Sequence, residues 1–468
     1  MKNTQPLVLI NAVGLTPKLL KFAPKLQQLA LNGWMRPLKE SLPAVTATCQ
    51  ATILTGKEPS VHGIVGNGWL FRDTAEVRFW QQSNHLIQAE PIYKTASRLA
   101  QAQGSSFKCA KMFWWFNQGA DVDISVTPKP YYGADGNKAF GISGSSQELT
   151  TGLEKKLGAF PFPSFWGPMA GLPCTRWIAQ ATAEIITHET PNLTLAYLPH
   201  LDYDPQRFGP TGSDMPKLTR ELDHACEPIL DAAKAKGARV WVVSEYGHCN
   251  VQSAIEPNKI LRKHGFLVCR DGPFGETIDF FASRAFAVCD HQLAHIYIKD
   301  SKDIPKVKAI LEETPGIKII LDEEGKKSMG LAHPRSGELV ALSENNKWFA
   351  YPYWLDESRA PDFARTVDIH RKPGYDPCEL FFDPKLLFPK LKVIRKLLGK
   401  KLGFRTLMDV IPLDHSLVKG SHGLVCDNDE DCALLAGDGP APPLGKMPMI
   451  NVHGLMMNAL GFPDQALV

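Results

Sequence analysis

A run of hydroxyl side chains near the N-terminus is the first candidate for chemistry in this sequence. In SLPAVTATCQATILTGKEPSVHGIVGNGW, residues 41–69, Thr46 and Thr48 precede a predicted helical segment, Cys49 to Leu54, and a loop rich in Gly, Pro and Asn follows it. The positive end of a helix dipole and its free N–H groups favour a phosphoryl oxygen. A hydroxyl there could attack phosphorus, although Thr at such a position also serves simply as an N-cap.

Carboxylates and imidazoles follow two predicted strands further along the chain. The apolar runs 193–198 and 239–244 each come after a helical segment, and PHLDYDPQRFGP and EYGHCNV follow them. With the buried strand predicted at 7–13, this alternation indicates an α/β fold with a doubly wound, mostly parallel sheet. Ligands bind at the carboxyl ends of the strands in such sheets. Acidic and imidazole groups gathered at that edge suit a divalent metal.

The hydroxyl segment also carries a longer motif. LPAVTATCQATILTGKEPSVHGIVGN resembles the nucleophile segment of the alkaline phosphatase superfamily, in the branch of type I phosphodiesterases, nucleotide pyrophosphatases and phosphonoacetate hydrolase. In that pattern a nucleophilic Thr precedes a helix, and a TG turn and a P-x-x-HGI-x-x-N run follow. The resemblance implies that Thr46 is the nucleophile, with Thr48 as second candidate. It also implies that Asn67 donates a side-chain N–H to a phosphoryl oxygen.

The resemblance further implies two divalent metal ions, with zinc expected and Mn²⁺ or Mg²⁺ as alternatives. One ion would use Asn11, Thr46 and Glu245, and His248 is a further candidate for it. The other ion would use ligands from two later segments. These ligands are Asp202 and Gln206, in a segment shaped like D-x-x-x-H-x-x-G-P, and His422, in G-S-H-G.

Several of the family's ligand positions have changed in this chain. Val13 stands where the first strand should end in Asp, so Asn11, two residues earlier on the same face, is the substitute candidate. A buried Asn bonded to the backbone is the alternative interpretation. Gln206 replaces a His, and Glu245 and Tyr246 replace an Asp-His pair. The site has lost nitrogen ligands, which favours Mg²⁺ or Mn²⁺ or weakens metal binding.

Three residues outside these segments are candidates for contacts with substrate. Trp115 lies in the aromatic run FKCAKMFWWF, where a ring could stack on substrate or simply fill the core. Asp368 and His370 alternate on a strand-like segment beside Arg371 and Lys372, which would suit an anionic substrate. They could equally complete a metal site or have a structural role.

The chain divides into a core that is interrupted once. We predict a first core segment over 1–255, an inserted α+β cap domain over 256–345 and a second core segment over 346–468. The resemblance covers residues 7 to about 255 and 346 to the end. Asp290 and His291 imitate a metal pair, but alternating apolar neighbours predict a cap strand there. Residues 127–145, rich in Gly, Pro and Tyr, are predicted to form a surface loop.

Composition limits the class of protein. The net charge is +3 with 22% charged residues, which argues against a partner that is a nucleic acid polymer. Ten cysteines are scattered without a C-x-x-C pair, which is typical of a reducing compartment, and we expect a cytoplasmic protein. No apolar run reaches the length of a membrane span. The oligomeric state stays open.

Residues 385–405 carry many Lys and Arg among Leu, Ile and Phe. An amphipathic basic helix of this kind can lie on a membrane surface. We interpret it instead as a solvated polar face over an apolar stripe that packs on the core.

Together these features predict a metal-dependent hydrolase of small phosphate esters, cleaving phosphodiester or nucleotide pyrophosphate bonds through a covalent phosphothreonine on Thr46. A binding protein for a phosphorylated ligand, poor in metal and without hydrolytic activity, is the alternative from a different class. A phosphonate hydrolase or a phosphomutase of the same superfamily is a further alternative, although phosphomutases usually carry Ser as nucleophile.

Overall fold

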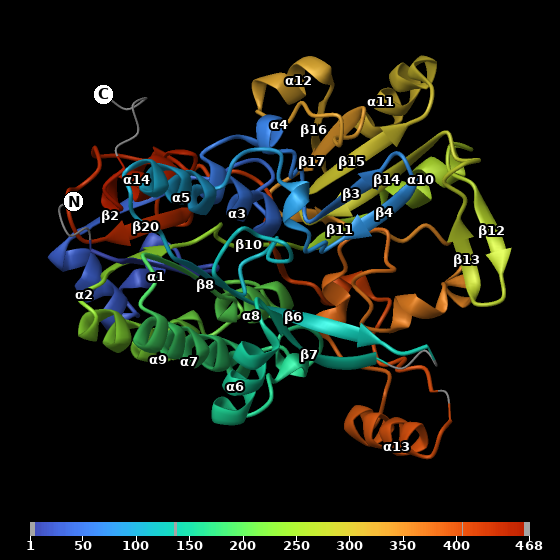
Figure 1. The fold of residues 1–468 in the computed structure, drawn as a ribbon. Helices are drawn as coiled ribbons and strands as arrows, with labels where there is room; N and C mark the ends of the chain where they lie inside the picture. Colours follow the sequence, from blue (N-terminus) through green and yellow to red (C-terminus); the bar gives the residue numbers. More distant parts are fainter. Residues whose placement is uncertain (1–4, 135–137, 405, 463–468) are drawn as a thin grey trace.

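A nine-stranded mixed sheet forms the centre of the molecule in the computed structural model, which describes residues 5–134, 138–404 and 406–462 (Figure 1). From edge to edge its strands are β21 (Met447–Pro448), β2 (Trp34–Lys39), β20 (Ala433–Gly437), β9 (Arg239–Val243), β1 (Leu7–Ala12), β8 (Leu193–Leu198), β5 (Cys109–Met112), β6 (Ile124–Tyr132) and β7 (Lys138–Gly144). The five strands from β9 to β6 are mutually parallel. The predicted doubly wound α/β fold is therefore confirmed.

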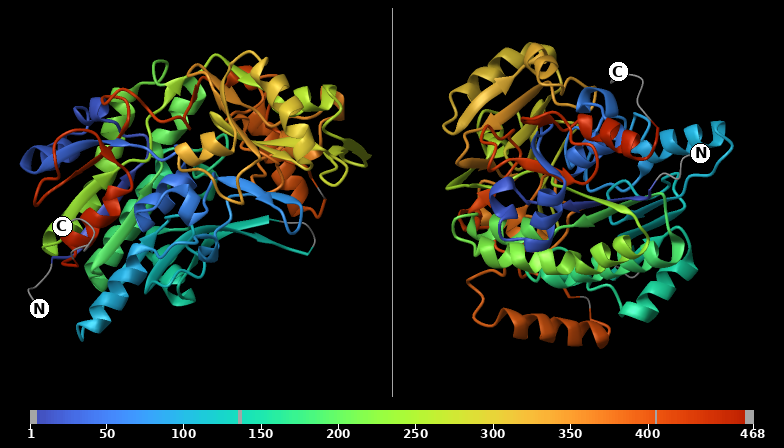
Figure 2. Two further views of the ribbon diagram at one scale, coloured as in Figure 1. Left: turned by 90° about the horizontal axis from the view of Figure 1, so that it is seen from above. Right: turned by 90° about the vertical axis from the view of Figure 1, so that its left-hand side faces the viewer.

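Helices cover both faces of this sheet. α3 (Thr46–Thr55), α5 (Ile92–Ala102) and α14 (Asn451–Ala459) pack together over one face, and α7 (Leu172–Glu189), α9 (Met215–Ala235) and α2 (Pro24–Asn32) cover the other (Figures 1 and 2). All six residues of β1 and all six of β8 are buried. Burial on both faces explains why these strands are continuous apolar runs in the sequence.

A second, antiparallel sheet lies inside the span 256–345. Its strands run in the order β14 (Ala285–Asp290), β15 (Leu293–Ile298), β17 (Leu339–Ser343) and β16 (Ile317–Leu321). α10 (Pro257–Lys263), α11 (Ile304–Glu312) and α12 (Glu323–Ser328) accompany it. This sheet has its own apolar core, which also takes in aromatic residues from 349 to 375. Further elements are α8 (His200–Phe208), β3 (Gly68–Phe71), β4 (Glu76–Phe79), α6 (Gln147–Leu157), β10 (Cys249–Asn250), β19 (Gly420–Ser421) and α13 (Pro389–Lys401).

The predicted loop at 127–145 is wrong, because most of it forms a β-hairpin. β6 and β7 pair antiparallel from Val126 opposite Gly144 to Tyr132 opposite Lys138. β5 pairs with β6 only as far as Val126. Beyond that point β6 is hydrogen-bonded to β7 on one side only, and its other edge is open. Pro128 and Pro130 have no backbone N–H to donate, and they lie where no second strand needs one.

Candidate active site

The candidate residues gather at the carboxyl ends of the central parallel strands. Asn11 lies near the end of β1, opposite Tyr197 of β8 and Val243 of β9. Asp202 lies in α8, which begins directly after β8, and Glu245 follows β9. Equal register across three parallel strands places these side chains at one edge of the sheet, as the alternation of strands and polar segments predicts.

Thr46 is the first residue of α3 and borders a large cavity. Val45 occupies the N-cap position, so the Thr46 side chain is not an N-cap. Its hydroxyl lies 2.9 Å from the hydroxyl of Tyr246. The Thr48 hydroxyl instead donates to the carbonyl oxygen of Ile64 at 3.1 Å, and this side chain is fully buried. Of the two candidate hydroxyls, only that of Thr46 is therefore placed to meet a ligand in this cavity.

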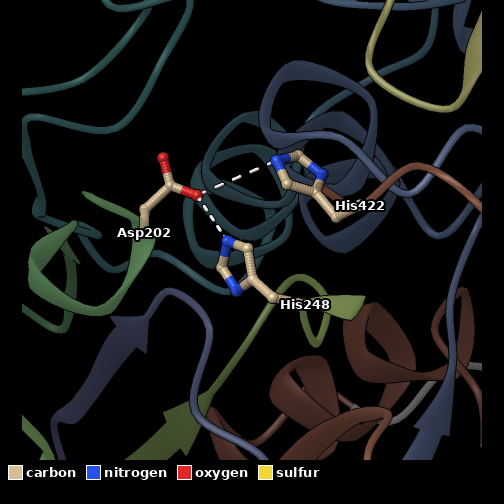
Figure 3. Close-up of side chains that lie close together, drawn as sticks. All are labelled: Asp202, His248 and His422. Atoms are coloured by element: carbon tan, nitrogen blue, oxygen red, sulfur yellow. Dashed lines mark hydrogen bonds and ion pairs between the residues drawn. The ribbon is translucent and has the colours of Figure 1, made fainter. Parts of the chain in front are cut away.

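Asp202, in α8, His248, between β9 and β10, and His422, directly after β19, converge from three separate segments of the chain (Figure 3). Asp202 Oδ1 lies 3.1 Å from His248 Nε2 and 3.8 Å from His422 Nε2. The three potential ligand atoms all lie within 4.8 Å of one another. Burial by itself would raise the pKa of Asp202, but the hydrogen bond with His248 and the nearby imidazoles lower it below its usual value. Asp202 is therefore the anion of the cluster.

The tautomer of His422 follows from its contacts. Nδ1 lies 2.8 Å from the carbonyl oxygen of Ala44, which can only accept a hydrogen bond, so Nδ1 carries the proton. Nε2 is buried and hydrogen-bonds to none of the residues that the structure describes. Burial holds the pKa of His422 well below its usual value, so the ring is neutral. A neutral imidazole held this way, with a free Nε2 beside a carboxylate, fits a divalent metal.

Gln206, predicted as a ligand, contacts protein groups at both ends of its amide. Nε2 donates to Asp202 Oδ2 at 2.9 Å, and Oε1 accepts from the Tyr375 hydroxyl at 2.7 Å. In this arrangement Gln206 orients the Asp202 carboxylate from behind.

Asn11 and Glu245 form a second polar group at the same edge. Asn11 Nδ2 donates to Glu245 Oε1 at 2.6 Å, and Gln50 Nε2 donates to the same oxygen at 2.7 Å. Asn11 Oδ1 and Glu245 Oε2 are buried without a hydrogen-bond partner in the described part of the chain. Burial raises the pKa of Glu245 to about 8. These oxygen atoms suit a hard cation better than zinc.

Tyr246 stands where the family pattern has a His, and it connects the two groups. Its hydroxyl donates to Asp202 Oδ1 at 3.2 Å, and its ring stacks on His422 with a centroid distance of 3.6 Å. Because a phenol has one proton, a Tyr246 hydroxyl that donates to Asp202 accepts the hydrogen bond from Thr46. In the sequence this residue was notable only because EYGH departs from the family's Asp-His pair, and its link to Thr46 was not apparent.

Asn67 contacts the residue that follows Thr46 in α3. Its Oδ1 accepts from the backbone N–H of Ala47 at 3.0 Å, and its Nδ2 donates to Asp290 Oδ1 at 3.0 Å. The backbone N–H of Asn67 donates to Asp290 Oδ2 at 2.6 Å, and burial raises the pKa of Asp290 to about 7. Asp290 is the last residue of β14, so the strand predicted for this segment is present, and its carboxyl group holds Asn67 in place. His291, the next residue, lies between the rings of His422 and Tyr375.

The cavity beside Thr46 has a volume of about 1390 Å³. Trp115, Asp368 and His370, the predicted substrate contacts, all line it. Trp115 packs against Trp80, with ring centroids 4.9 Å apart. Asp368 Oδ2 lies 3.3 Å from Lys138 Nζ and 3.3 Å from Arg371 Nε, and His370 Nδ1 lies 3.3 Å from the Phe79 carbonyl oxygen. One wall is thus aromatic, and another pairs a carboxylate with two cations.

A second cluster of potential metal ligands consists of Asp376, Cys378 and His415. The ammonium group of Lys372 lies 2.7 Å from Asp376 Oδ2 and is fully buried. This cation already balances the carboxylate, and burial raises the pKa of the Cys378 thiol well above its usual value. The second cluster therefore does not fit a metal as Asp202, His248 and His422 do.

Comparisons with known proteins agree with this architecture. The sequence profile described as type I phosphodiesterase / nucleotide pyrophosphatase matches residues 7–376. No curated protein gives a significant sequence match.

Among solved structures, murine ectonucleotide pyrophosphatase/phosphodiesterase 5, an inactive variant in complex with AMP, is 15% identical with a TM-score of 0.59. Phosphonoacetate hydrolase from Sinorhizobium meliloti 1021 in complex with phosphonoformate has the same identity and TM-score. Both alignments cover 98% of this chain and 95% of the other. At this identity the two structures establish the fold.

Proposed function

Because this chain belongs to the type I phosphodiesterase and nucleotide pyrophosphatase family, we propose that it hydrolyses phosphodiester or nucleotide pyrophosphate bonds of small substrates with the help of divalent metal ions. The observation that carries the proposal is the position of Thr46. Thr46 is the first residue of a buried helix, and its side chain lines the cavity. Its hydroxyl lies beside the hydrogen-bonded pair of Tyr246 and Asp202. The helix N-terminus favours the negative charge of a phosphoryl group at that point.

In this proposal Thr46 Oγ1 attacks phosphorus and the bond to the leaving oxygen breaks, which produces a phosphothreonine. Water then cleaves the bond between phosphorus and Oγ1 and restores Thr46. The hydrogen bonds from Thr46 to Tyr246 and from Tyr246 to Asp202 hold the Thr46 hydroxyl in a fixed orientation at the cavity, and its proton passes to the leaving oxygen as the ester bond breaks. A bound divalent ion supplies positive charge that favours the alkoxide form of a nearby hydroxyl and balances the phosphoryl oxygens.

We propose that the two metal positions differ in chemistry. Asp202, His248 and His422 would hold zinc, which imidazole and carboxylate ligands suit. Asn11, Glu245 and Thr46 would hold a second ion through oxygen atoms alone, a set that favours Mn²⁺ or Mg²⁺. His248 contacts Asp202, which supports assigning it to the first position and not to the position with Glu245. Gln206 and Asn67 would orient Asp202 and the start of α3.

The cavity supports a substrate with an anionic group and a planar or apolar part. Trp115 and Trp80 offer aromatic faces, and Lys138 and Arg371 lie at the same cavity beside Asp368. A nucleotide has this combination of features, and one structural neighbour was solved with AMP. A phosphonate is a second candidate because another neighbour is a phosphonoacetate hydrolase. A cytoplasmic location stays a prediction based on the cysteine pattern.

The alternative of a metal-poor binding protein has one specific observation in its favour. The second metal position offers Tyr246 in place of an imidazole, and Glu245 is already held by Asn11 and Gln50. A weakly bound second ion would limit hydrolysis while leaving the cavity able to bind a phosphorylated ligand.

Metal analysis combined with turnover separates these two functions. Protein purified without chelator is analysed by mass spectrometry for metal, and hydrolysis of bis(p-nitrophenyl) phosphate is measured with added Zn²⁺ or Mn²⁺. We expect bound zinc and turnover in the wild type, and a loss of about 1,000-fold or more in Thr46→Ala. Thr48→Ala is the matched control and should keep its activity, since its hydroxyl contacts Ile64. Binding of AMP is measured separately by isothermal titration. Binding of AMP without any turnover under these conditions would favour the binding protein.

A further inference from the structure

Residues 386–404 and 406–407 present an unusual density of exposed apolar side chains. Of the 22 large apolar residues that are exposed in the described part of the chain, nine lie between Leu387 and Leu407. They are Leu387, Phe388, Leu391, Ile394, Leu397, Leu398, Leu402, Phe404 and Leu407. The interpretation of this segment as a polar face over a core stripe is therefore wrong.

Three exposed apolar residues of α13 and Leu402, which directly follows the helix, form one stripe. Leu391, Ile394, Leu398 and Leu402 recur at intervals of three and four residues, and their exposed fractions are 62%, 53%, 56% and 75%. Residues at these intervals lie on the same side of a helix. Burying apolar surface away from water is favourable, so a stripe of this width normally packs against another element. Here about half or more of each side chain stays in water.

Contacts on its other sides keep α13 in this orientation. Lys392 Nζ lies 3.0 Å from Asp409 Oδ2, and Lys396 forms a second ion pair with the same carboxylate. Val393 and Leu397 line the cavity that also contains Thr46. Figures 1 and 2 show α13 as a separate helix set apart from the layers of the core. Ile394 of the stripe also lines this cavity, whereas Leu391, Leu398 and Leu402 do not, so these three leucines face away from it.

The charge of the segment indicates what covers this stripe. Residues 385–405 contain eight Lys or Arg and no Asp or Glu. Lys390 and Arg395 lie between these apolar residues in the sequence, and neither forms an ion pair with a described residue, although Lys390 also lines the cavity. Cations that flank an apolar stripe on one helix match the surface of a bilayer with anionic head groups, where the side chains enter the acyl boundary and the cations meet phosphates.

We propose that α13 and its flanking residues dock in the plane of an anionic lipid bilayer. Among the described helices none combines the length and apolar composition needed to cross a bilayer, and docking of this kind needs no such helix. Because other residues of α13 line the cavity, docking through Leu391 and Leu398 brings the cavity near the lipid surface. This inference does not depend on the proposed hydrolysis.

Co-sedimentation of the 468-residue chain with vesicles tests the proposal. One set of vesicles is phosphatidylcholine alone, and the other contains about one-quarter phosphatidylglycerol. We expect the wild type to sediment with the anionic vesicles and to be released when NaCl is raised from about 50 to about 500 mM. Leu391→Ser/Leu398→Ser should weaken this binding by about tenfold or more, with turnover of bis(p-nitrophenyl) phosphate unchanged, since neither residue lines the cavity.

The matched control replaces two exposed leucines elsewhere on the molecule. Leu31 and Leu444 are 72% and 89% exposed, and Leu31→Ser/Leu444→Ser should bind vesicles like the wild type. Failure of the wild type to bind anionic vesicles at low salt would overturn the proposal, as would equal losses in the two double variants. A dimer in size-exclusion chromatography that Leu391→Ser/Leu398→Ser dissociates would also overturn it, because a second copy would then cover the stripe.

Discussion

The Tyr246 hydroxyl lies 2.9 Å from Thr46 Oγ1 and donates to Asp202 Oδ1 at 3.2 Å. A single phenol thus joins the proposed nucleophile to the carboxylate of the proposed zinc position. In the family pattern this residue is a His that binds metal. The phenol can move a proton, but its high pKa, raised further by burial, makes it a poor metal ligand.

Tyr246→His should therefore strengthen the second metal position. We expect its affinity for Zn²⁺ to rise by about tenfold or more, because an imidazole adds a nitrogen ligand beside Glu245. Isothermal titration of metal-free protein measures the effect. Tyr246→Phe is the control, since it keeps a ring to stack on His422 and removes the hydroxyl; it should not gain affinity. Equal affinities in the wild type and Tyr246→His would contradict the prediction.

His422→Ala should abolish tight zinc binding at the first position. The substitution removes one of three ligand atoms, so the loss should exceed the roughly 10- to 100-fold typical of losing an outer hydrogen-bond partner. His415→Ala alters the second cluster, where Lys372 balances Asp376, and zinc content should stay unchanged. Mass spectrometry of the intact proteins gives both values. If zinc is lost in His415→Ala and kept in His422→Ala, the metal binds at the cluster of Asp376, Cys378 and His415 instead.

Asp290→Asn should change how stability depends on pH. Burial raises the pKa of Asp290 to about 7, so the folded state keeps a proton that the unfolded state releases near pH 4. Its contribution to folding is complete below pH 4 and is lost as pH rises through 7. Asn stays neutral, so the free energy of unfolding of Asp290→Asn relative to wild type should rise by about 3 kcal/mol between pH 5 and 8.

Urea denaturation in the presence of a chelator measures this difference. The exposed Asp73→Asn is the control, and its stability relative to wild type should stay nearly constant over the same range. Parallel stability curves for Asp290→Asn and the wild type would show that Asp290 ionises as an ordinary carboxyl group.

Asp368→Asn should improve the binding of an anionic substrate. The carboxylate pairs with Lys138 and Arg371 at the cavity, and its removal frees two cations. We expect KM for a nucleotide substrate to fall by up to about tenfold, equivalent to about 1.4 kcal/mol, with little change in kcat. Asp362→Asn removes a charge at the same cavity from a residue without an ion pair among those described. Its effect on KM should be smaller, and equal effects would contradict the role of the freed cations.

Much of the site could be predicted from sequence because its chemistry follows local signals. Continuous apolar runs predicted β1, β8 and β9, and the polar segments after them could lie only at one edge of a parallel sheet. A hydroxyl before a helical segment predicted the position of Thr46. Interactions across long separations were less accessible. The bond between Thr46 and Tyr246 spans 200 positions, and that between Asn67 and Asp290 spans 223.

By itself, the sequence determined the alternation of strands and helices, the family and the set of polar groups at the sheet edge, because each depends on short-range patterns of apolar and motif residues. Tertiary structure decided that His248 joins Asp202 and His422, since proximity in space selects partners that spacing leaves open. It also decided that β6 continues past Pro128 along an open edge. Finally, it decided which way α13 faces: periodicity shows that a helix has an apolar stripe, but only the packed chain shows whether anything covers it.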